Sequence, residues 1–159
     1  MSLRTDLLQL LEYGRQIELN FAGELTEEQR ALRGSPAQWA PKDILPHLAL
    51  YRLRAVDTIA ALRRGEAPVA PKDGNAFNDA AVIEHADDPW PRVMGYARRG
   101  YLALRHTVDG LSDDELRNLI VPGSQPRPLW RALSVYGYSH TVGHIAGWYD
   151  ANGQPELGE

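Results

Sequence analysis

Apolar residues recur at steps of three and four positions in four segments of the chain, and this spacing predicts four amphipathic helices. The first predicted helix covers residues 3–23, and the second covers 41–64, with a proline suited to its first position. The third begins near Pro89, and the last covers 128–151. We therefore expect an all-α fold in which the four helices pack as one bundle. The apolar stripes of the first three helices are Leu7, Leu11, Ile17 and Phe21; Leu48, Tyr51, Ala55, Ile59 and Leu62; and Met94, Ala97, Tyr101, Leu104, Val108 and Leu111.

Polar segments separate these predicted helices. Thr26 and Gln29 have the spacing of a capping box, as do Ser112 and Glu115, so each pair predicts a brief additional helix. Residues 65–88 are rich in Gly, Pro, Asn and Asp and predict a long loop, and loops of this length are often functional. A cluster of prolines then breaks the chain before the last helix, and no segment alternates as a strand does.

The composition limits both the chemistry and the location of the chain. Its 159 residues fit a single domain, expected to cover 1–159. Because there is no cysteine, a bound metal must use imidazole, carboxylate or water ligands. The net charge of -4 is mild and the basic residues are dispersed, which argues against a nucleic-acid partner. The chain begins without a signal-peptide pattern and has no apolar stretch long enough to span a bilayer, so we expect a cytoplasmic protein.

His140 and His144 lie on the predicted packing face of the last helix. Imidazoles at positions i and i+4 share one helix face and can bind a single cation, whereas buried neutral histidines without partners are costly. His47, at the edge of the second helix's stripe, can face this pair across the bundle. Three imidazoles with an open position form a metal site of the catalytic type. The predicted face passes, in alternating steps of four and three, through Leu133, Gly137, His140, His144, Gly147 and Ala151.

The two remaining histidines receive a plainer interpretation. His85 lies beside acidic residues in the 65–88 segment, and His106 lies off the stripe of the third helix. We interpret both as solvated side chains. His85 would reach the metal site only if the 65–88 segment folded over it.

Two segments of the chain resemble motifs of the DinB/YfiT-like superfamily of metalloenzymes. Residues 39–48 have a tryptophan, a polar helix start and then His-Leu, and residues 140–148 are similar to the family's HxxxHxxG signature. The resemblance extends over nearly the whole chain, since length, helix number and both motif positions agree. One departure is Pro46, which predicts a bend just before His47. The matching residues are Trp39, Ala40, Pro41, Lys42, Asp43, Ile44, Leu45, His47 and Leu48, and His140, Thr141, Val142, Gly143, His144, Ile145, Ala146, Gly147 and Trp148.

The resemblance implies a four-helix bundle with up-down-down-up connectivity. In that arrangement the first helix lies beside the second, the third lies beside the fourth, and 65–88 is the crossover. The resemblance also implies a divalent ion, commonly nickel or zinc, held by His47, His140 and His144. Relatives include S-transferases that use low-molecular-weight thiols such as mycothiol or bacillithiol, and homodimers are common. We therefore expect a metal-dependent enzyme that transfers such a thiol to an electrophilic small molecule.

Two other functions remain open from the sequence. A metal-dependent hydrolase would use the same histidines with water as the nucleophile, and a nearby general base would help it. Asp43 lies one turn before His47, but a role at the helix start suits it better. The third function is a non-catalytic metal-binding stress protein.

Several residues are candidates to bind the thiol or substrate. Tyr51 and Arg54 follow His47 on its helix face, and Arg54 is suited to anchor a carboxylate. Tyr136 and Trp148 flank the histidine pair, and Trp39 precedes the second helix. The alternative interpretation of Tyr51, Tyr136 and Trp148 is that they are core residues. The segment that carries Asn75, Phe77 and Asn78 is a candidate to shape the pocket.

Overall fold

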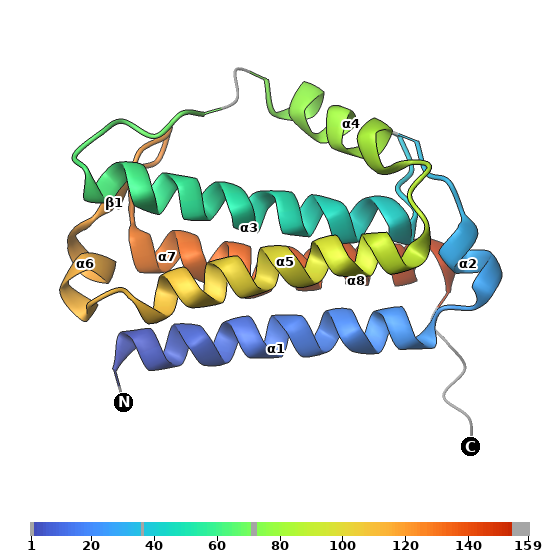
Figure 1. Ribbon diagram of the computed structural model, residues 1–159, viewed down its shortest axis with the longest axis horizontal. Helices are drawn as coiled ribbons and strands as arrows, with labels where there is room; N and C mark the ends of the chain where they lie inside the picture. The colour runs from blue at the N-terminus through green and yellow to red at the C-terminus, as the bar shows by residue number, and fades with distance from the viewer. Residues whose placement is uncertain (1, 36, 71–72, 154–159) are drawn as a thin grey trace.

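A computed structural model describes residues 2–35, 37–70 and 73–153, and within these ranges nearly all regular structure is helical (Figure 1). The predicted all-α class is therefore confirmed in its broad form. None of the described helices is long and apolar enough to cross a membrane. The long helices are α1 (Leu3–Glu24), α3 (Pro41–Arg63), α5 (Trp90–Asp109) and a final continuous run of α7 (Leu129–Ser134), η1 (Val135–Ser139) and α8 (His140–Asn152); the short ones are α2 (Glu27–Ala31), α4 (Gly74–His85) and α6 (Asp113–Asn118).

Local hydrogen bonds explain why most helices begin where the sequence predicts. At α2, the Thr26 hydroxyl accepts from the Gln29 backbone N–H while the Gln29 side chain accepts from the Thr26 backbone N–H. The Ser112 and Glu115 pair forms the same capping box at α6. Each box satisfies backbone donors that the first turn of a helix leaves unpaired. Both predicted capping boxes are therefore confirmed.

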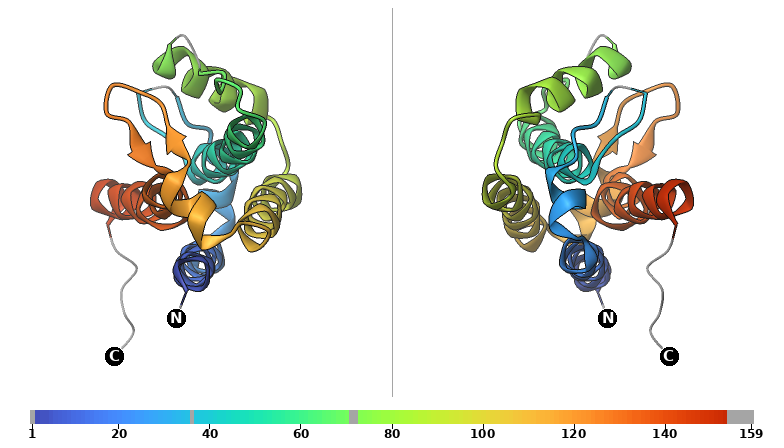
Figure 2. Two further views of the ribbon diagram at one scale, coloured as in Figure 1. Left: turned by 90° about the vertical axis from the view of Figure 1, so that its left-hand side faces the viewer. Right: turned by 90° about the vertical axis from the view of Figure 1, so that its right-hand side faces the viewer.

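The long helices pack side by side as a bundle, two in each direction (Figures 1 and 2). α1 and the final run point one way, and α3 and α5 point the other. α3 packs most extensively on α5, and α1 packs against α5 and the final run. Viewed from the end, α1 lies diagonally across the bundle from α3. The expected neighbour pairs, first with second and third with fourth, are therefore wrong.

The predicted loop over 65–88 is also wrong for much of its length, because it contains the helix α4. The Asp73 carboxylate accepts hydrogen bonds from the backbone N–H groups of Asn75 and Ala76, which caps this helix. Since α3 and α5 are parallel neighbours, the chain between them must return along the bundle. α4 makes this return outside the bundle, packed against α3 (Figure 2).

A small antiparallel ladder precedes the last helix, although the sequence pattern indicates no strand there. β1 (Ile120–Val121) pairs with β2 (Arg127–Pro128), with Val121 opposite Arg127. Strands of two residues are too short to show an alternating pattern. The ladder closes the proline-rich turn and leads directly into α7.

The interior consists of two apolar clusters with a layer of polar side chains between them. Along α1, the first cluster ends at Leu11 and the second begins at Phe21. The gap on this helix contains Arg15 and Glu18, both buried. The corresponding gaps on α3 and α8 contain Arg52 and Thr141, which are fully buried as well. We call these four side chains, Arg15, Glu18, Arg52 and Thr141, the buried polar layer.

The final run contains a π-helical segment, η1, that changes which face of α8 is buried. After it, the buried positions are Thr141, Ile145 and Trp148, each one residue later than the predicted face. A π turn contains more residues than an α turn, so it rotates the helix that follows relative to the helix before it. The predicted packing face is therefore wrong beyond Gly137. His140 and His144 are half-buried at the edge of α8, and Gly147 is exposed.

Candidate metal centre

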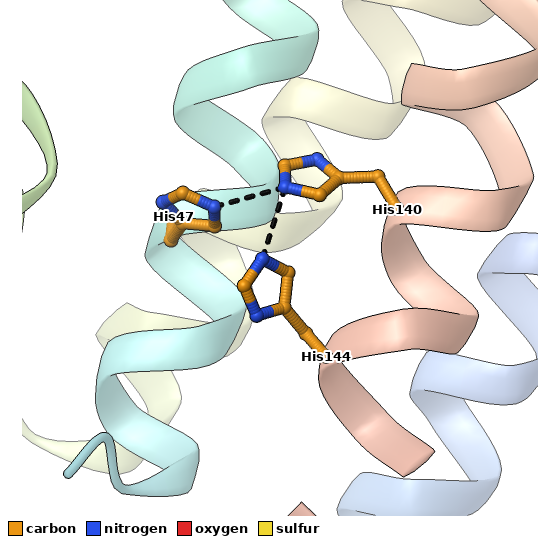
Figure 3. Close-up of side chains that lie close together, drawn as sticks. All are labelled: His47, His140 and His144. Atoms are coloured by element: carbon orange, nitrogen blue, oxygen red, sulfur yellow. Dashed lines mark hydrogen bonds between the residues drawn. The ribbon is translucent and has the colours of Figure 1, made fainter. Parts of the chain in front are cut away.

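Three histidine side chains from two helices converge between α3 and α8 (Figure 3). The Nε2 atoms of His47 and His140 are 3.0 Å apart, and so are those of His144 and His140. His47 comes from α3, whereas the other two are one turn apart on α8. The predicted meeting of the three histidines is therefore confirmed.

The donor set fits a divalent cation. Two imidazole nitrogens bound to one tetrahedral zinc ion, each at 2.0–2.1 Å from it, lie about 3.4 Å apart. The observed separations of 3.0 Å are close to this value. Without a cation the contacts are poor, because a ring nitrogen cannot donate one hydrogen bond and accept another at once. The Nε2 of His140 therefore cannot satisfy both of its neighbours as a neutral group.

Burial keeps the three imidazoles in the neutral form that binds metals. Loss of hydration lowers the pKa of His47 from its ordinary 6.5 to about 3, with further lowering by the neighbouring His140 and His144. Burial, the charge of His144 and the charge of Arg52 lower the pKa of His140 to about 4. The pKa of His144 is lowered by burial as well. A cation therefore has little competition from protons at neutral pH.

Aromatic rings surround the imidazoles. Trp39 stacks on His144, with ring centroids 5.2 Å apart and planes inclined by 17°, and its ring meets His47 at 4.5 Å. Tyr51 lies 4.7 Å from the His47 ring and 5.0 Å from the His140 ring. Among the described residues, the buried Nδ1 atoms of His47 and His140 have no hydrogen-bond partner. Packing, rather than hydrogen bonding of Nδ1, therefore orients these two rings.

The buried polar layer lies directly beside the histidines. Arg52 donates a hydrogen bond from Nη2 to the Thr141 hydroxyl over 2.9 Å, and its Nη1 lies 2.5 Å from Glu18 Oε1. Arg15 donates to the other Glu18 oxygen over 2.8 Å. Thr141 follows His140 in the chain, so this layer joins α1 and α3 to the helix that carries two of the ligands.

The start of α3 explains how His47 is placed. Pro41 occupies the first turn, and the Asp43 carboxylate accepts a hydrogen bond from the Ala40 backbone N–H over 2.8 Å. Asp43 is buried, and burial raises its pKa despite this hydrogen bond. α3 then continues without interruption through Pro46. Asp43 therefore has the helix-start role that suited it in the sequence.

Three of the candidate pocket residues form a group on the side of the histidines toward α4. The Tyr51 hydroxyl donates to Asn78 Oδ1 over 3.0 Å, and the Tyr51 ring lies 6.1 Å from the Tyr136 ring. The Arg54 guanidinium lies 5.9 Å from the Tyr51 ring centroid and 5.6 Å from that of Phe77. The 65–88 segment therefore approaches the site through Phe77 and Asn78. Asn75 is exposed at the start of α4.

The other sequence candidates lie farther from the cluster. Trp148 is buried, with its ring 5.3 Å from that of Phe21, so it is mainly a core residue. The interpretation of His85 as solvated is wrong, because its side chain is half-buried and pairs with Asp88 at 2.8 Å, whereas His106 is exposed on α5 as expected. Neither belongs to the histidine cluster.

Two pockets lie near the candidate centre. One, of about 400 Å³, includes His144 and Trp39 in its lining. The other, of about 650 Å³, lies along α3 and includes Arg54 and Phe77 but none of the three histidines. The first pocket is therefore the one in direct contact with a metal ligand.

Sequence reasoning missed the buried polar layer. Its signal was present on the first helix, because Arg15 and Glu18 continue the three- and four-residue steps of the stripe from Leu11. Charged residues at such positions are buried only when they are paired. Arg52 gave no comparable signal, since its partners lie on other helices.

The chain was compared with protein-family models, curated proteins and solved structures, and none of them matches it. The functional proposal therefore rests on the geometry of the histidine cluster and on the resemblance of its motif residues.

Proposed function

We propose that this chain is a divalent-metal-dependent enzyme of the DinB/YfiT-like type, which transfers a low-molecular-weight thiol to an electrophilic small molecule. The convergence of the Nε2 atoms of His47, His140 and His144 carries this proposal. The directions of the four long helices fit the up-down-down-up connectivity of that family. The motif residues that suggest the family include the same three histidines.

Each residue at the candidate site would have a distinct role in this reaction. The three neutral imidazoles would hold nickel or zinc, and such an ion lowers the pKa of a bound thiol so that it reacts as the thiolate. Tyr51 and Trp39 flank the imidazoles and would exclude water from the reacting atoms. In the transfer the thiol proton goes to solvent, sulfur forms a bond to an electrophilic carbon, and the leaving group departs with its electron pair. The thiol comes from outside, since the chain has no cysteine.

Hydrolysis has less support. A general base near the histidines would help it, but Asp43, the carboxylate suggested by the sequence, accepts a hydrogen bond from the Ala40 backbone N–H at the start of α3. Within the described residues, the three Nε2 atoms form hydrogen bonds only with one another, and no carboxylate contacts them. We further propose that the enzyme acts in the cytoplasm as a homodimer, with the family resemblance as the support.

Metal content is the first test. The chain is purified without an affinity tag, and bound metals are measured by inductively coupled plasma mass spectrometry. We expect about one nickel or zinc ion per chain in the wild type and a loss in His144→Ala. His106→Ala is the matched control, because His106 is exposed on α5 and outside the cluster. A metal-free wild type, or equal content in His144→Ala, would contradict the proposal.

Thiol conjugation is the second test. The metal-loaded and chelator-treated proteins are assayed with 1-chloro-2,4-dinitrobenzene and with mycothiol, bacillithiol or glutathione. We expect one thiol to be conjugated at a rate that depends on the metal. Metal binding without conjugation of any of the three thiols would contradict the transferase and favour a non-catalytic metal-binding protein.

A further inference from the structure

The pocket beside His144 begins at the candidate metal centre and extends along one side of α8. Its volume is about 400 Å³, within the range of sites that bind small molecules. It is lined by Ala37, Gln38, Trp39, Ile44, Gly143, His144, Gly147, Trp148, Ala151 and Asn152.

The lining is mainly apolar and aromatic, with the amides of Gln38 and Asn152 as its uncharged polar side chains. Ile44 and Trp148 are buried, and the Trp39 ring lies nearly parallel to the His144 imidazole. The lining includes no Asp, Glu, Lys or Arg, and His144 is its one titratable side chain among the described residues. An aromatic ring placed here would gain stacking and apolar contact, whereas a charged group would find no oppositely charged side chain in the lining.

Two glycines keep this pocket open. A Cβ atom added at Gly143 or at Gly147 would meet no other atom within 4 Å. These glycines are therefore not required for helix packing, in contrast to Gly14 and Gly100, where an added Cβ would meet backbone of another helix. A larger side chain at Gly147 would extend into the pocket without a clash from its Cβ.

We propose that this pocket binds a flat, uncharged aromatic group of the electrophilic substrate and so holds its reactive carbon at the histidines. The proposal rests on the proposed function, since it takes the three histidines as the reacting end of the site. Because His144 belongs to both the cluster and the lining, the pocket adjoins the candidate metal position. The pocket along α3, with Arg54, differs in charge and does not include a histidine ligand.

The test uses two probes that bind metals in the same way and differ by one ring. Imidazole and 4-phenylimidazole are titrated into the zinc-loaded protein by calorimetry. If the phenyl ring enters the pocket, we expect 4-phenylimidazole to bind at least about ten times more tightly than imidazole, as burial of a phenyl ring allows. In Gly147→Leu we expect this preference to disappear, with the imidazole affinity and the zinc content unchanged.

Ala146→Leu is the matched control, because Ala146 is exposed on α8 next to Gly147 and does not line the pocket. It should keep the wild-type preference for 4-phenylimidazole. Ala151→Trp is a second variant, which fills the pocket from a position two turns beyond His144. It should lose the preference even if Gly147→Leu alters zinc binding.

The outcomes separate this proposal from the function on which it rests. A protein that binds no zinc, or zinc but no imidazole, contradicts the proposed function. A protein that binds imidazole and 4-phenylimidazole equally, or a preference that survives both filling variants, overturns the pocket assignment alone. If a second copy of the chain covered the pocket, 4-phenylimidazole would show no advantage and Gly147→Leu would change the mass measured by light scattering, which also overturns the assignment.

Discussion

Arg52 on α3 donates a hydrogen bond to the hydroxyl of Thr141 on α8 over 2.9 Å, at the residue that follows His140. The same guanidinium contacts Glu18 of α1 at 2.5 Å. Arg52 thus connects α3 to α1 and α8 close to the histidines. Since α3 carries His47 and α8 carries His140, we expect this contact to help set the distance between the two imidazoles. We therefore expect Arg52 and Thr141 to be positioning residues for the candidate metal centre.

Thr141→Val should weaken both the fold and metal binding. Valine has nearly the shape of threonine but leaves a fully buried guanidinium N–H without its acceptor. A buried donor without a partner costs about 1–3 kcal/mol, measured here by urea unfolding of the metal-free protein. We also expect a weaker zinc affinity in a competition titration with a fluorescent chelator.

Thr141→Ser is the conservative control for that change, because serine keeps the hydroxyl. It should restore zinc affinity most of the way to the wild-type value. If Thr141→Val lost stability but kept the wild-type zinc affinity, the contact would be structural only, and the positioning role would be wrong.

Glu18→Gln should be strongly destabilising. Glu18 is fully buried between Arg15 and Arg52, so its neutralisation leaves two guanidinium groups in the interior without a counter-charge. Removal of one partner from a buried ion pair typically costs about 3–5 kcal/mol. Urea unfolding measures the change, and Glu28→Gln on the exposed face of α2 should differ from the wild type by less than about 0.5 kcal/mol. A small effect of Glu18→Gln would contradict the network.

Gly14→Ala should destabilise the packing of α1 on the π-helical segment. A Cβ at this position would meet the Gly137 carbonyl oxygen, a backbone atom that cannot move aside as a side chain can. Overpacking of this kind typically costs about 1–3 kcal/mol in thermal or urea unfolding. Gly23→Ala lies on the same helix, where a Cβ meets nothing within 4 Å, and it should be neutral or stabilising because alanine favours helix. Equal effects of the two changes would contradict the close approach.

Zinc should stabilise the folded protein through the three histidines. A ligand that binds only the folded state, at a free concentration of 100 times its Kd, adds about 2.7 kcal/mol to the free energy of unfolding. We expect a corresponding rise in Tm for the wild type and for His106→Ala. His140→Ala should show little rise, since it removes the imidazole that contacts both others. An equal rise in His140→Ala would place the zinc elsewhere.

The metal-free protein should lose stability as the pH falls below about 6.5, the ordinary pKa of histidine. Burial lowers the pKa of His47 to about 3 and that of His140 to about 4 in the folded protein. Between these values and pH 6.5 the unfolded chain binds more protons than the folded one, so the free energy of unfolding decreases. Well above pH 6.5 these histidines are neutral in both states, so they no longer change the free energy of unfolding with pH.

Urea unfolding of the metal-free protein at several pH values checks this prediction. His47→Gln should reduce the decline between pH 6.5 and 4, because one low-pKa group is removed. His106→Gln, on the exposed surface of α5, should follow the wild-type decline. A decline of the same steepness in His47→Gln would show that other groups cause it.

Local signals predicted the starts of the short helices α2 and α6 well, because neighbouring residues determine where these helices begin. The capping boxes at Thr26 and Ser112 formed as expected. The helix α4 was missed because the Gly, Pro, Asn and Asp residues scattered over 65–88 indicated a loop, although Asp73 caps the helix in the usual way. The average composition of the 65–88 segment thus hid the helix cap at Asp73.

The sequence predicted the three histidines of the candidate site, but it did not predict which residues surround them. His140 and His144 share a face wherever that face points, so the pair follows from spacing alone. Which side of the helix faces the core depends on η1, and no residue type marks a π segment. The contacts of Arg52 with Glu18 and Thr141 join three helices, so they follow from the packing of the bundle and not from any local pattern.

The π-helical segment also affects how the last helix can be aligned with other sequences. Leu129 to Ser134 and His140 to Asn152 are two helical segments offset by one residue, even though the chain forms one continuous rod. An alignment that forbids gaps inside helices would match the histidines of this chain to buried leucines of an ordinary bundle. A one-residue gap within 135–139 brings the core positions into correspondence and leaves both histidines on the side of the helix that faces α3.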